Sequence, residues 1–281
     1  MGTLFVVGTP IGNLEDLTPR AARILGQVDL IAAEDTRVTR RLLSHLGIKT
    51  PLISYNENNR RERLPKLLET LASGNVALVT DAGMPGISDP GTELVARAAE
   101  EGAAVESVPG ASAVTTAIAV SGLPGNDFLF LGFLPRKRRE RLARLHDQVY
   151  SPHTLVIFEA PHRVLATLAD MAEALGDRRI SVCRELTKLH EEVFRGTVNE
   201  AIAYFPSPRG EFVLVIQGNL EPSGSTDPAG AQLSAARDRL AELRTLGAAP
   251  KDAVSQVSSG FGLPRNTVYR WWIDLERPDR P

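Results

Sequence analysis

The sequence predicts an α/β fold with two α/β domains and a small C-terminal helical module. Short runs rich in β-branched residues, such as TLFVVG and VDLIAAE, alternate with amphipathic segments from the N-terminus onward. This alternation is typical of a mainly parallel sheet covered by helices on both faces. The pattern breaks at LPGND after Gly122 and starts again at FLFLGF. We therefore predict a parallel α/β domain over 1–122, a mixed α/β domain over 123–219, a linker over 220–231 and a helical, helix-turn-helix-like module over 232–281.

Helix signals separate the predicted strands of the first domain. Thr18 can cap a helix that has Pro19 in its first position, and Gly47 is typical of a helix end. The predicted strands are TLFVVG, VDLIAAE, PLIS, VALVT and AAVESV, and the remaining helices run over about 36–46, 61–73, 92–101 and 112–121.

The later strands of the second domain are predicted to pair antiparallel, because the segments between them are too short for crossover helices. Its strands are FLFLGF, TLVIFEA, RISVCREL, EVFRG and EFVLVIQG, with a charged helix after the first strand and a helix over about 161–175. The segment NLEPSGSTDPAGAQ has the composition of a linker. Helices are predicted beyond it near 232–246, 251–258 and 265–275, and the turn between the last two suggests a helix-turn-helix.

Composition narrows the class of protein. The 281 residues carry a formal net charge of −2, so nucleic-acid binding has to come from local basic patches. Cys183 is the only cysteine, which excludes an internal disulfide and fits a reducing cytoplasm. The sequence has no visible metal cluster, signal peptide or apolar run long enough to span a membrane. We expect a soluble, cytoplasmic protein without a bound metal and without a membrane partner.

Three strand ends carry unusual loops. VVGTPIGN follows the first strand, DAGMPGISDPG follows VALVT, and SVPGASAV runs from a strand into a helix of small residues. Open parallel sheets bind ligands outside the carboxyl ends of their strands. Glycine lets a ligand approach the main chain and proline stiffens a loop, so DAGMPGISDPG is suited to hold a ligand with backbone groups. The alternatives for the three loops are, in order, a tight turn, a pair of structural turns and plain helix packing.

Several enzyme classes lack their motifs in this sequence. It has no GK[ST] of a P-loop and no tyrosine followed four residues later by lysine, as expected of a short-chain dehydrogenase. His190 lacks the second histidine of a zincin helix. Ser112 lies in G-A-S-A-V, which lacks the second glycine of a nucleophile elbow, so a hydrolase is not predicted.

Six motifs occur in a specific order: GTPIGNLED, AAEDTR, DAGMPGISDPG, VPGASAVTTAI, FEAPHR and LTKLHEEVFRG. With them the chain resembles the tetrapyrrole-methylase-like superfamily of S-adenosylmethionine-dependent methyltransferases. Within that superfamily it is most similar to the bacterial family that 2′-O-methylates a cytidine of 16S ribosomal RNA. The similarity covers residues 1 to about 219 and continues into the tail, and it departs at Met84 and Ala111, where threonine and proline are expected.

The resemblance implies two α/β domains of the tetrapyrrole-methylase type, with S-adenosylmethionine in the cleft between them and a homodimer as the assembly. Carried over motif by motif, the expected cofactor-binding residues are Pro10, Ile11, Gly83, Met84, Ile87, Ser88, Ala111, Ser112, Ala113, Leu134 and Ala160.

Methyl transfer to a ribose hydroxyl needs a group that takes the hydroxyl proton. Asp35 and Arg37 follow the second strand in EDTR, where they could meet the target nucleotide. The alternatives are a helix cap for Asp35 and a capping or packing role for His162. The predicted catalytic residues are Asp35, Arg37, Glu159 and His162, and Glu34, Lys188, His190 and Glu191 are further candidates near the cleft.

Basic residues gather after GFLP in RKRRERLAR, which holds six basic residues and one acidic residue. RNA phosphates would explain this run and would make binding salt-sensitive, whereas the alternative is a solvated helix face. The predicted RNA-binding residues are Arg136, Lys137, Arg138, Arg139, Arg163 and Lys188. The expected partner is 16S rRNA within the small ribosomal subunit. Two other functions stay open, which are methylation of a precorrin-type tetrapyrrole and ligand sensing by a helix-turn-helix regulator.

Overall fold

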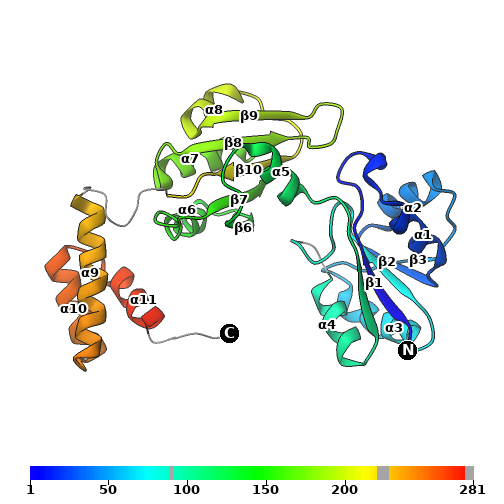
Figure 1. Cartoon of the computed structure of the whole chain (residues 1–281), viewed down its shortest axis with the longest axis horizontal. Coiled ribbons are helices and arrows are strands. Elements are labelled where there is room, and N and C mark those ends of the chain that lie inside the picture. Colours follow the sequence, from blue (N-terminus) through cyan, green and yellow to red (C-terminus); the bar gives the residue numbers. More distant parts are fainter. Residues whose placement is uncertain (89–90, 220–227, 276–281) are drawn as a thin grey trace. The chain divides into compact units, whose positions relative to one another are not determined.

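The computed structural model describes residues 1–88, 91–219 and 228–275. It divides into two compact units, Met1–Gly218 and Asn219–Pro281. The first unit holds two five-stranded sheets, one formed by β1 to β5 and the other by β6 to β10 (Figure 1). The predicted α/β fold class is confirmed.

The first sheet is parallel throughout, as predicted, and has the strand order β3-β2-β4-β1-β5. Because the strands are parallel, their carboxyl ends all lie at one edge of the sheet. The loops that follow β4, β1 and β5 therefore start from three neighbouring strands. The strands are β1 (Thr3–Val7), β2 (Leu30–Ala33), β3 (Leu52–Ser54), β4 (Val76–Val79) and β5 (Ala104–Val108).

Helices cover both faces of the first sheet. Successive residues of β4 point to opposite faces and belong to two separate cores, in which Leu78 packs with Leu67 and Val79 packs with Leu25. Both cores consist largely of buried aliphatic side chains, each worth roughly 1.5 to 3 kcal/mol of burial. The helices are α1 (Pro19–Gln27), α2 (Thr36–His45), α3 (Arg60–Leu71) and α4 (Thr92–Glu100), with a short 3-10 helix, η1 (Leu14–Asp16).

The second sheet is mixed. Its order is β6-β7-β10-β8-β9, in which β6 and β7 are parallel and the later strands pair antiparallel, as predicted. The strands are β6 (Phe128–Phe133), β7 (Thr154–Glu159), β8 (Arg179–Arg184), β9 (Glu192–Thr197) and β10 (Phe212–Ile216).

The chain between β6 and β10 also forms the helices α6 (Arg138–His146), α7 (Val164–Leu175) and α8 (Val198–Tyr204). The predicted helix start at 161 is too early, because Pro161 to Arg163 form a turn. Helix α8 is absent from the predicted elements, although TVNE is a capping box in which Thr197 and Glu200 exchange hydrogen bonds. This seven-residue helix lies in the connection from β9 to β10, and the later strands still pair antiparallel.

Helix α5 (Ala113–Ser121) follows the first sheet in the chain but packs on the second sheet. It contacts β8, β9 and β10, and its Val114 and Ala117 lie in one apolar cluster with Val215 of β10. The predicted boundary after Gly122 assigns this helix to the first domain. Its packing instead makes α5 part of the lobe of the second sheet.

The second unit consists of α9 (Pro228–Thr245), α10 (Pro250–Phe261) and α11 (Arg265–Leu275). Helix α9 begins before the predicted start near 232 and within the predicted linker. Residues 220–227 of that linker, and 276–281 of the predicted module, lie outside the described residues.

A small apolar core holds these three helices together. Trp272 is buried in it beside Leu240, and Arg237 lies 4.6 Å from the centre of the Trp271 ring. Gly262 ends α10 with a left-handed φ of 65°, which turns the chain into α11. In the part of the chain that the structure describes, no helix is long and apolar enough to cross a membrane.

Candidate active site

The three unusual loops meet at the carboxyl edge of the first sheet. The amide of Thr9 donates to the carbonyl of Gly83 at 2.9 Å, and the amide of Gly83 donates to the carbonyl of Thr9 at 3.1 Å. The amide of Gly8 donates to the carbonyl of Val108 at 3.0 Å. A Cβ atom on Gly8 would lie 2.7 Å from the Cα of Gly110, so the first and third loops touch through their backbones.

The second loop uses left-handed backbone conformations. Gly83 and Gly86 have φ angles of 87° and 82°, which glycine adopts without strain. Ser88 has a φ of 64°, a conformation that is uncommon for a residue with a side chain and is enriched at binding sites. Residues 89–90, which belong to the motif DAGMPGISDPG, lie outside the described residues.

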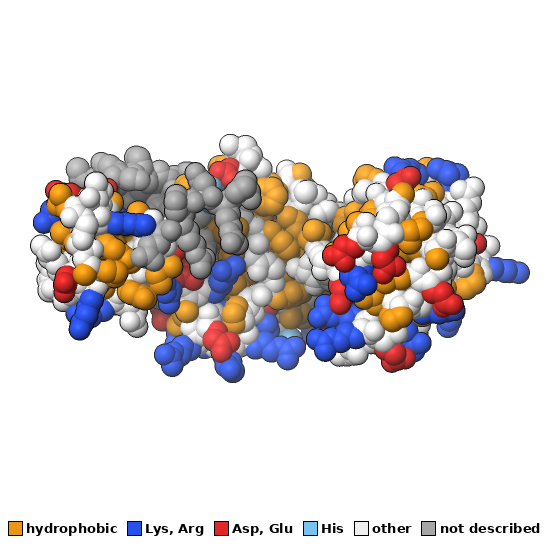
Figure 2. Space-filling model, turned by 90° about the horizontal axis from the view of Figure 1, so that it is seen from below, with side chains coloured by type: hydrophobic (Ala, Val, Ile, Leu, Met, Phe, Trp, Pro, Cys, Tyr) orange, Lys and Arg blue, Asp and Glu red, His pale blue; other side chains and the backbone are white. Residues whose placement is uncertain are grey.

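A cavity of about 390 Å³ opens between these loops and the second sheet. We call it the apolar cavity, because much of its wall is hydrophobic. Figure 2 shows hydrophobic side chains in the recessed surface between the two lobes of the first unit, with Lys and Arg side chains at its margin. Its wall includes Ile11, Gly83, Met84, Ile87, Ser88, Ser112, Ala113 and Ala160 from the predicted cofactor-binding residues.

Three of the predicted cofactor-binding residues, Pro10, Ala111 and Leu134, are not part of this wall. Leu134 is 2% exposed and packs in the core of the second sheet. Its carbonyl group accepts a hydrogen bond from Arg163. Three aromatic residues of the wall, Phe133, Phe158 and Phe212, are absent from the predicted set. Phe133 and Phe158 line the cavity from neighbouring strands with ring centres 5.6 Å apart.

The charged residues of the apolar cavity all have one sign. The wall includes four carboxylates, Glu34, Asp81, Glu159 and Glu211, and none of its described residues is Lys or Arg. A ligand with a positive charge and an apolar body fits such a wall, whereas a phosphate-bearing ligand would find no cation to pair with. A sulfonium nucleoside such as S-adenosylmethionine meets both requirements.

A second cavity, of about 490 Å³, adjoins the first at the same sheet edge. We call it the polar cavity, because hydrophilic residues form its wall. It shares Glu34 and Asp81 with the apolar cavity. Glu34 directly follows β2, and Asp81 is separated from the end of β4 by Thr80 alone. The remaining wall residues are Asp35, Thr36, Arg37, Ser54, Asn56, Glu57 and Asn58.

Asp35 and Arg37 form a close pair in the polar cavity. The Asp35 carboxylate caps α2 by accepting a hydrogen bond from the backbone amide of Arg37 at 2.8 Å. It also accepts hydrogen bonds from Nε and Nη2 of the Arg37 side chain at 3.0 and 2.5 Å. The side-chain hydrogen bond from Arg37, followed by its backbone amide, lowers the pKa of Asp35 from 3.8 to about 2. The helix cap weighed from the sequence is therefore present, and the catalytic role of both residues stays a prediction.

Asp81 is a residue of both cavity walls that is absent from the predicted site. Its Oδ1 accepts the backbone amide of Asp35 at 3.0 Å. Partial burial raises the pKa of Asp81 above its ordinary value, and the nearby charges of Glu34 and Asp35 raise it as well, against the lowering effect of the Asp35 amide. The signal in the sequence was its position, since Asp81 follows the buried run VALVT at the ligand-binding edge of the sheet.

Glu34 fixes the end of β4 relative to β2. Its Oε2 accepts the hydroxyl of Thr80 at 2.6 Å and the amide of Asp81 at 3.3 Å. Glu34, which is named above as a further candidate near the cleft, thus lies in the wall of both cavities and holds its neighbour Asp81 in place.

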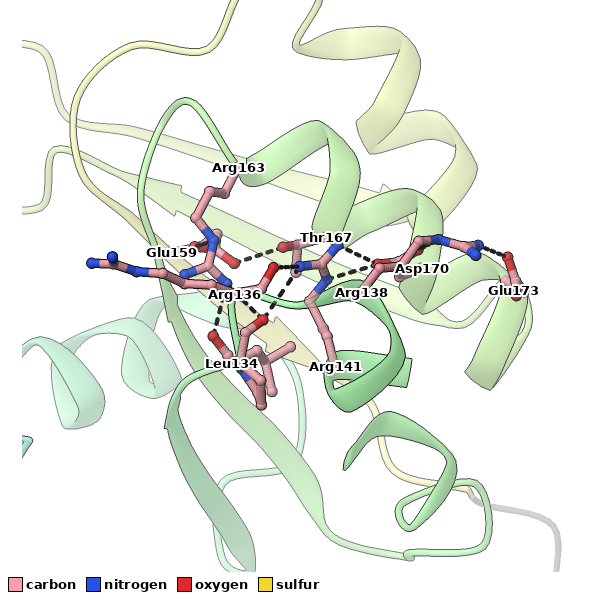
Figure 3. Close-up of polar contacts among 10 residues, drawn as sticks. Leu134, Arg136, Arg138, Arg141, Glu159, Arg163, Thr167, Asp170 and Glu173 are labelled. Carbon is pink, nitrogen blue, oxygen red and sulfur yellow. Dashed lines mark hydrogen bonds and ion pairs between the residues drawn. The ribbon is translucent and has the colours of Figure 1, made fainter. Parts of the chain in front are cut away.

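Glu159, at the end of β7, is buried and bound by three donors (Figure 3). It accepts the hydroxyl of Thr167 at 2.6 Å, the amide of Ala160 at 2.9 Å and, as an ion pair, Nε of Arg163 at 3.2 Å. His162 is exposed and does not belong to either cavity wall. Of the two predicted catalytic residues in FEAPHR, only Glu159 reaches the apolar cavity, where its hydrogen bonds suit a positioning role.

A second buried carboxylate, Asp170, holds the basic loop that follows β6 (Figure 3). Arg141 is 6% exposed, and its Nε donates to Asp170 at 2.7 Å while its Nη1 donates to the carbonyl of Arg136 at 3.1 Å. Arg138 donates to Asp170 at 2.9 Å and also pairs with Glu173. Two guanidinium groups of the basic run are thus used to fold the protein.

The predicted RNA-binding residues differ in what they already contact. Lys188 lies between Glu185 and Glu211, at 3.0 and 2.9 Å, and Lys137 lies 3.1 Å from Glu140. Arg136 and Arg139 are exposed, and neither has an ion pair among the described residues. The RNA-binding role of all six predicted residues stays a prediction, and these two exposed side chains are the best placed for it.

The fold and these cavities define a class of protein. A parallel sheet and a mixed sheet share one unit, and glycine-rich loops at the edge of the parallel sheet face an acidic, largely apolar cavity. The chain belongs to the family of tetrapyrrole (corrin/porphyrin) methylases, whose model matches residues 3–202.

The curated relatives of the chain include several proteins named ribosomal RNA small subunit methyltransferase I. The one from Halalkalibacterium halodurans is 46% identical over 271 residues, which cover 95% of this chain and 93% of the relative. The one from Synechocystis sp. is 47% identical over 283 residues, or 98% of this chain and 99% of the relative. The one from Thermotoga maritima is 53% identical over 222 residues, which cover 78% of this chain but 99% of the relative.

Solved structures share the fold. A diphthine synthase aligns with a TM-score of 0.62 and 14% identity over 77% of this chain and 90% of that chain. The methyltransferase CobJ aligns with a TM-score of 0.59 and 18% identity over 80% of this chain and 98% of that chain. At such identities the likeness concerns the architecture alone.

Proposed function

We propose that this protein uses S-adenosylmethionine to methylate the 2′-hydroxyl of a cytidine ribose in small-subunit ribosomal RNA. The observation that carries the proposal is the pair of adjoining cavities at one sheet edge, one apolar with carboxylates and the other polar. The names of the relatives supply the substrate class, since they are small-subunit ribosomal RNA methyltransferases over nearly the whole length of this chain.

The apolar cavity suits the methyl donor. Its carboxylates complement the positive charges of the sulfonium and amino groups, and the apolar side chains offer a surface to the adenine ring. The backbone groups of the second loop, which is set by Gly83 and Gly86, are available to the amino-acid end. When bound, the donor supplies an electrophilic methyl group.

The polar cavity suits the target nucleoside. It lies at the carboxyl edge beside the first cavity, and its wall offers the amide of Asn58 and the pair of Asp35 and Arg37 to base and sugar groups. The wall shared by the two cavities would bring the ribose hydroxyl to the methyl group, and such alignment contributes about 7 to 11 kcal/mol to the lowering of the barrier. Side chains of this chain have to orient the hydroxyl and accept its proton.

Exposed basic side chains near the cavities would bind the RNA backbone. Arg136 precedes α6 and Arg139 lies within it. Arg40 and Arg41 are exposed on α2, the helix that starts at the polar cavity. Each phosphate contact adds to the dependence of binding on salt. The helical unit is proposed as an accessory RNA-docking module, and the homodimer and the cytoplasmic location stay predictions.

Two experiments test this function. Titration calorimetry with S-adenosylmethionine and with its demethylated product is expected to show binding at one site per chain. Incubation with labelled donor and small ribosomal subunits, followed by nuclease digestion and mass spectrometry, is expected to yield a 2′-O-methylated cytidine. Naked 16S rRNA in parallel reveals whether the assembled particle is required.

The same assays separate the other functions. Methylation of a precorrin-type tetrapyrrole without any transfer to RNA would contradict the proposal and favour a tetrapyrrole substrate. Ligand-dependent binding to duplex DNA without turnover would also contradict it and favour a helix-turn-helix regulator.

A further inference from the structure

Three carboxylates surround the place where the two cavities meet. Glu34 and Asp81 belong to the walls of both cavities, and Asp35 belongs to the polar cavity alone. A methyl group that passes from a donor in one cavity to a hydroxyl in the other has to cross this shared wall. The proton acceptor for the hydroxyl is therefore expected among groups that face both spaces.

Asp35 has a poor geometry for taking a proton. Both of its oxygens are bound by Arg37, and Oδ1 also accepts the Arg37 amide that starts α2. The same bonds lower its pKa to about 2. A group this acidic has little driving force to accept a proton from a hydroxyl.

Glu34 is occupied by a structural task. Its Oε2 binds the hydroxyl of Thr80 and the amide of Asp81, which ties the end of β2 to the end of β4. Removing that carboxylate from its place would also release the residue beside it. Glu34 is thus a positioning residue for Asp81.

Asp81 has the geometry that the other two lack. Its Oδ1 accepts one backbone amide, that of Asp35, and among the described residues no donor is bound to its Oδ2. The residue is exposed to the space that both cavities share, so a hydroxyl can reach the carboxylate. The charged groups that face it are Glu34 at the end of β2, Asp35 and Arg37 at the start of α2 and Glu57 across the polar cavity.

We propose that Asp81 is the catalytic residue that accepts the proton of the ribose hydroxyl. The hydroxyl oxygen forms a bond to the methyl carbon, and the carbon–sulfur bond breaks with its electron pair going to sulfur. The hydroxyl proton moves to Oδ2 of Asp81. The positive charge of the donor and the negative charge of Asp81 are both neutralised, so the products are a thioether, a methyl ether and a protonated carboxyl group.

Partial burial raises the pKa of Asp81, and the charge of Glu34 raises it further. Both effects strengthen Asp81 as a base relative to an ordinary aspartate. Glu34 therefore contributes twice, since it holds the Asp81 amide and its charge increases the basicity of the neighbouring carboxylate.

The inference rests on the proposed function and is tested by a comparison of variants. Single-turnover methylation of small ribosomal subunits is measured for the wild type, Asp81→Asn, Asp35→Asn and the control Glu69→Gln, which changes an exposed carboxylate on α3. The side chain introduced by Asp81→Asn keeps an oxygen that can accept the Asp35 amide, so the loop stays in place. This variant is expected to slow transfer by about 10² to 10⁴-fold. Calorimetry is expected to show unchanged donor binding.

The pH profile distinguishes catalysis from structure. The wild-type rate is expected to fall at acid pH as one group becomes protonated, and this acid limb is expected to persist in Asp35→Asn and Glu69→Gln and to vanish in Asp81→Asn. Asp81→Glu is expected to recover part of the lost rate. An Asp81→Asn rate within about threefold of the wild type, or an unchanged acid limb, would overturn the inference. Failure of the wild type itself to methylate ribose would instead overturn the proposed function.

Discussion

Arg163 joins a buried carboxylate to the loop that follows β6. Its Nε lies 3.2 Å from Oε1 of Glu159, and its Nη2 donates to the carbonyl of Leu134 at 2.7 Å. The side chain thereby links the wall of the apolar cavity to the start of the basic segment (Figure 3). The Glu159 side chain is fully buried, so it depends on this partner.

Removal of that partner is the first prediction. Arg163→Ala leaves the Glu159 charge buried without a cation, which is expected to destabilise the first unit by about 3 to 5 kcal/mol. Urea unfolding measures the loss, with Arg139→Ala as an exposed control that is expected to change stability by less than about 0.5 kcal/mol. The double variant Arg163→Ala, Glu159→Gln is expected to recover part of the stability. Additive losses in the double variant would contradict a direct interaction.

The second prediction concerns Glu34 and pH. The negative charge of Glu34 helps to raise the pKa of Asp81, so Glu34→Gln is expected to lower the Asp81 pKa. The acid limb of methylation then moves to lower pH, because Asp81 stays ionised further into the acid range. The plateau rate is expected to fall as the base becomes weaker. A limb that stays in place, or moves to higher pH, would show that Glu34 does not act on Asp81 in this way.

The pair of Asp35 and Arg37 gives a third prediction. The pKa of Asp35 is lowered from 3.8 to about 2 in the folded protein, so the pair stabilises the fold fully above the ordinary pKa of aspartate. That stabilisation is lost as pH falls from about 4 to about 2. The difference in unfolding free energy between wild type and Asp35→Asn is therefore expected to shrink over this range. A difference that is independent of pH over this range would show that the contacts with Arg37 do not lower the pKa of Asp35.

A fourth prediction separates two arginines of the basic run. Arg139→Ala is expected to weaken RNA binding and to reduce the dependence of log affinity on log salt by about one unit. Arg138 is held by Asp170 and Glu173, so Arg138→Ala is expected to change the salt dependence less and the stability more. Filter binding at several salt concentrations, together with urea unfolding, measures both quantities. The reverse ranking in the binding series would show that Arg138 leaves its carboxylates to reach RNA.

The helical unit gives a fifth prediction. The length matched in the Thermotoga maritima relative is close to that of Met1–Gly218, and it covers 99% of that protein. A chain that ends at Gly218 is therefore expected to fold and to bind the methyl donor with unchanged affinity in calorimetry. Its affinity for small ribosomal subunits is expected to fall if the helical unit docks RNA. Loss of donor binding would instead show that the first unit depends on the second.

Local signals in the sequence were enough for the elements and for the loops at the sheet edge. Thr18 caps α1 as predicted, with its hydroxyl oxygen 3.1 Å from the amide of Ala21, and Gly47 has the left-handed φ of 68° that is typical of a helix end. The ends of parallel strands follow from strand order, so the meeting of the three loops could be predicted as well.

Features that depend on tertiary contacts were harder to predict. The neighbours of Asp81 lie at the end of β2 and the start of α2. The sequence around VALVT does not show that these elements come close to Asp81 in space. Leu134 follows the cavity-lining Phe133 directly in the sequence. Because successive side chains of a strand point to opposite faces, Phe133 lines the cavity and Leu134 packs in the core. The basic run likewise gave no sign that Arg141 is buried against Asp170, a residue of another helix.

The placement of α5 affects how the chain folds while it is being synthesised. Residues 113–121 leave the ribosome long before β10, at 212–216, which supplies much of the surface on which they pack. The nascent first lobe can complete its own sheet while α5, which packs on the second sheet, still exposes Val114 and Ala117 to solvent. A fragment released at Gly122 would therefore carry an uncovered apolar helix and tend to aggregate, so the two lobes mature together even though their sheets are separate.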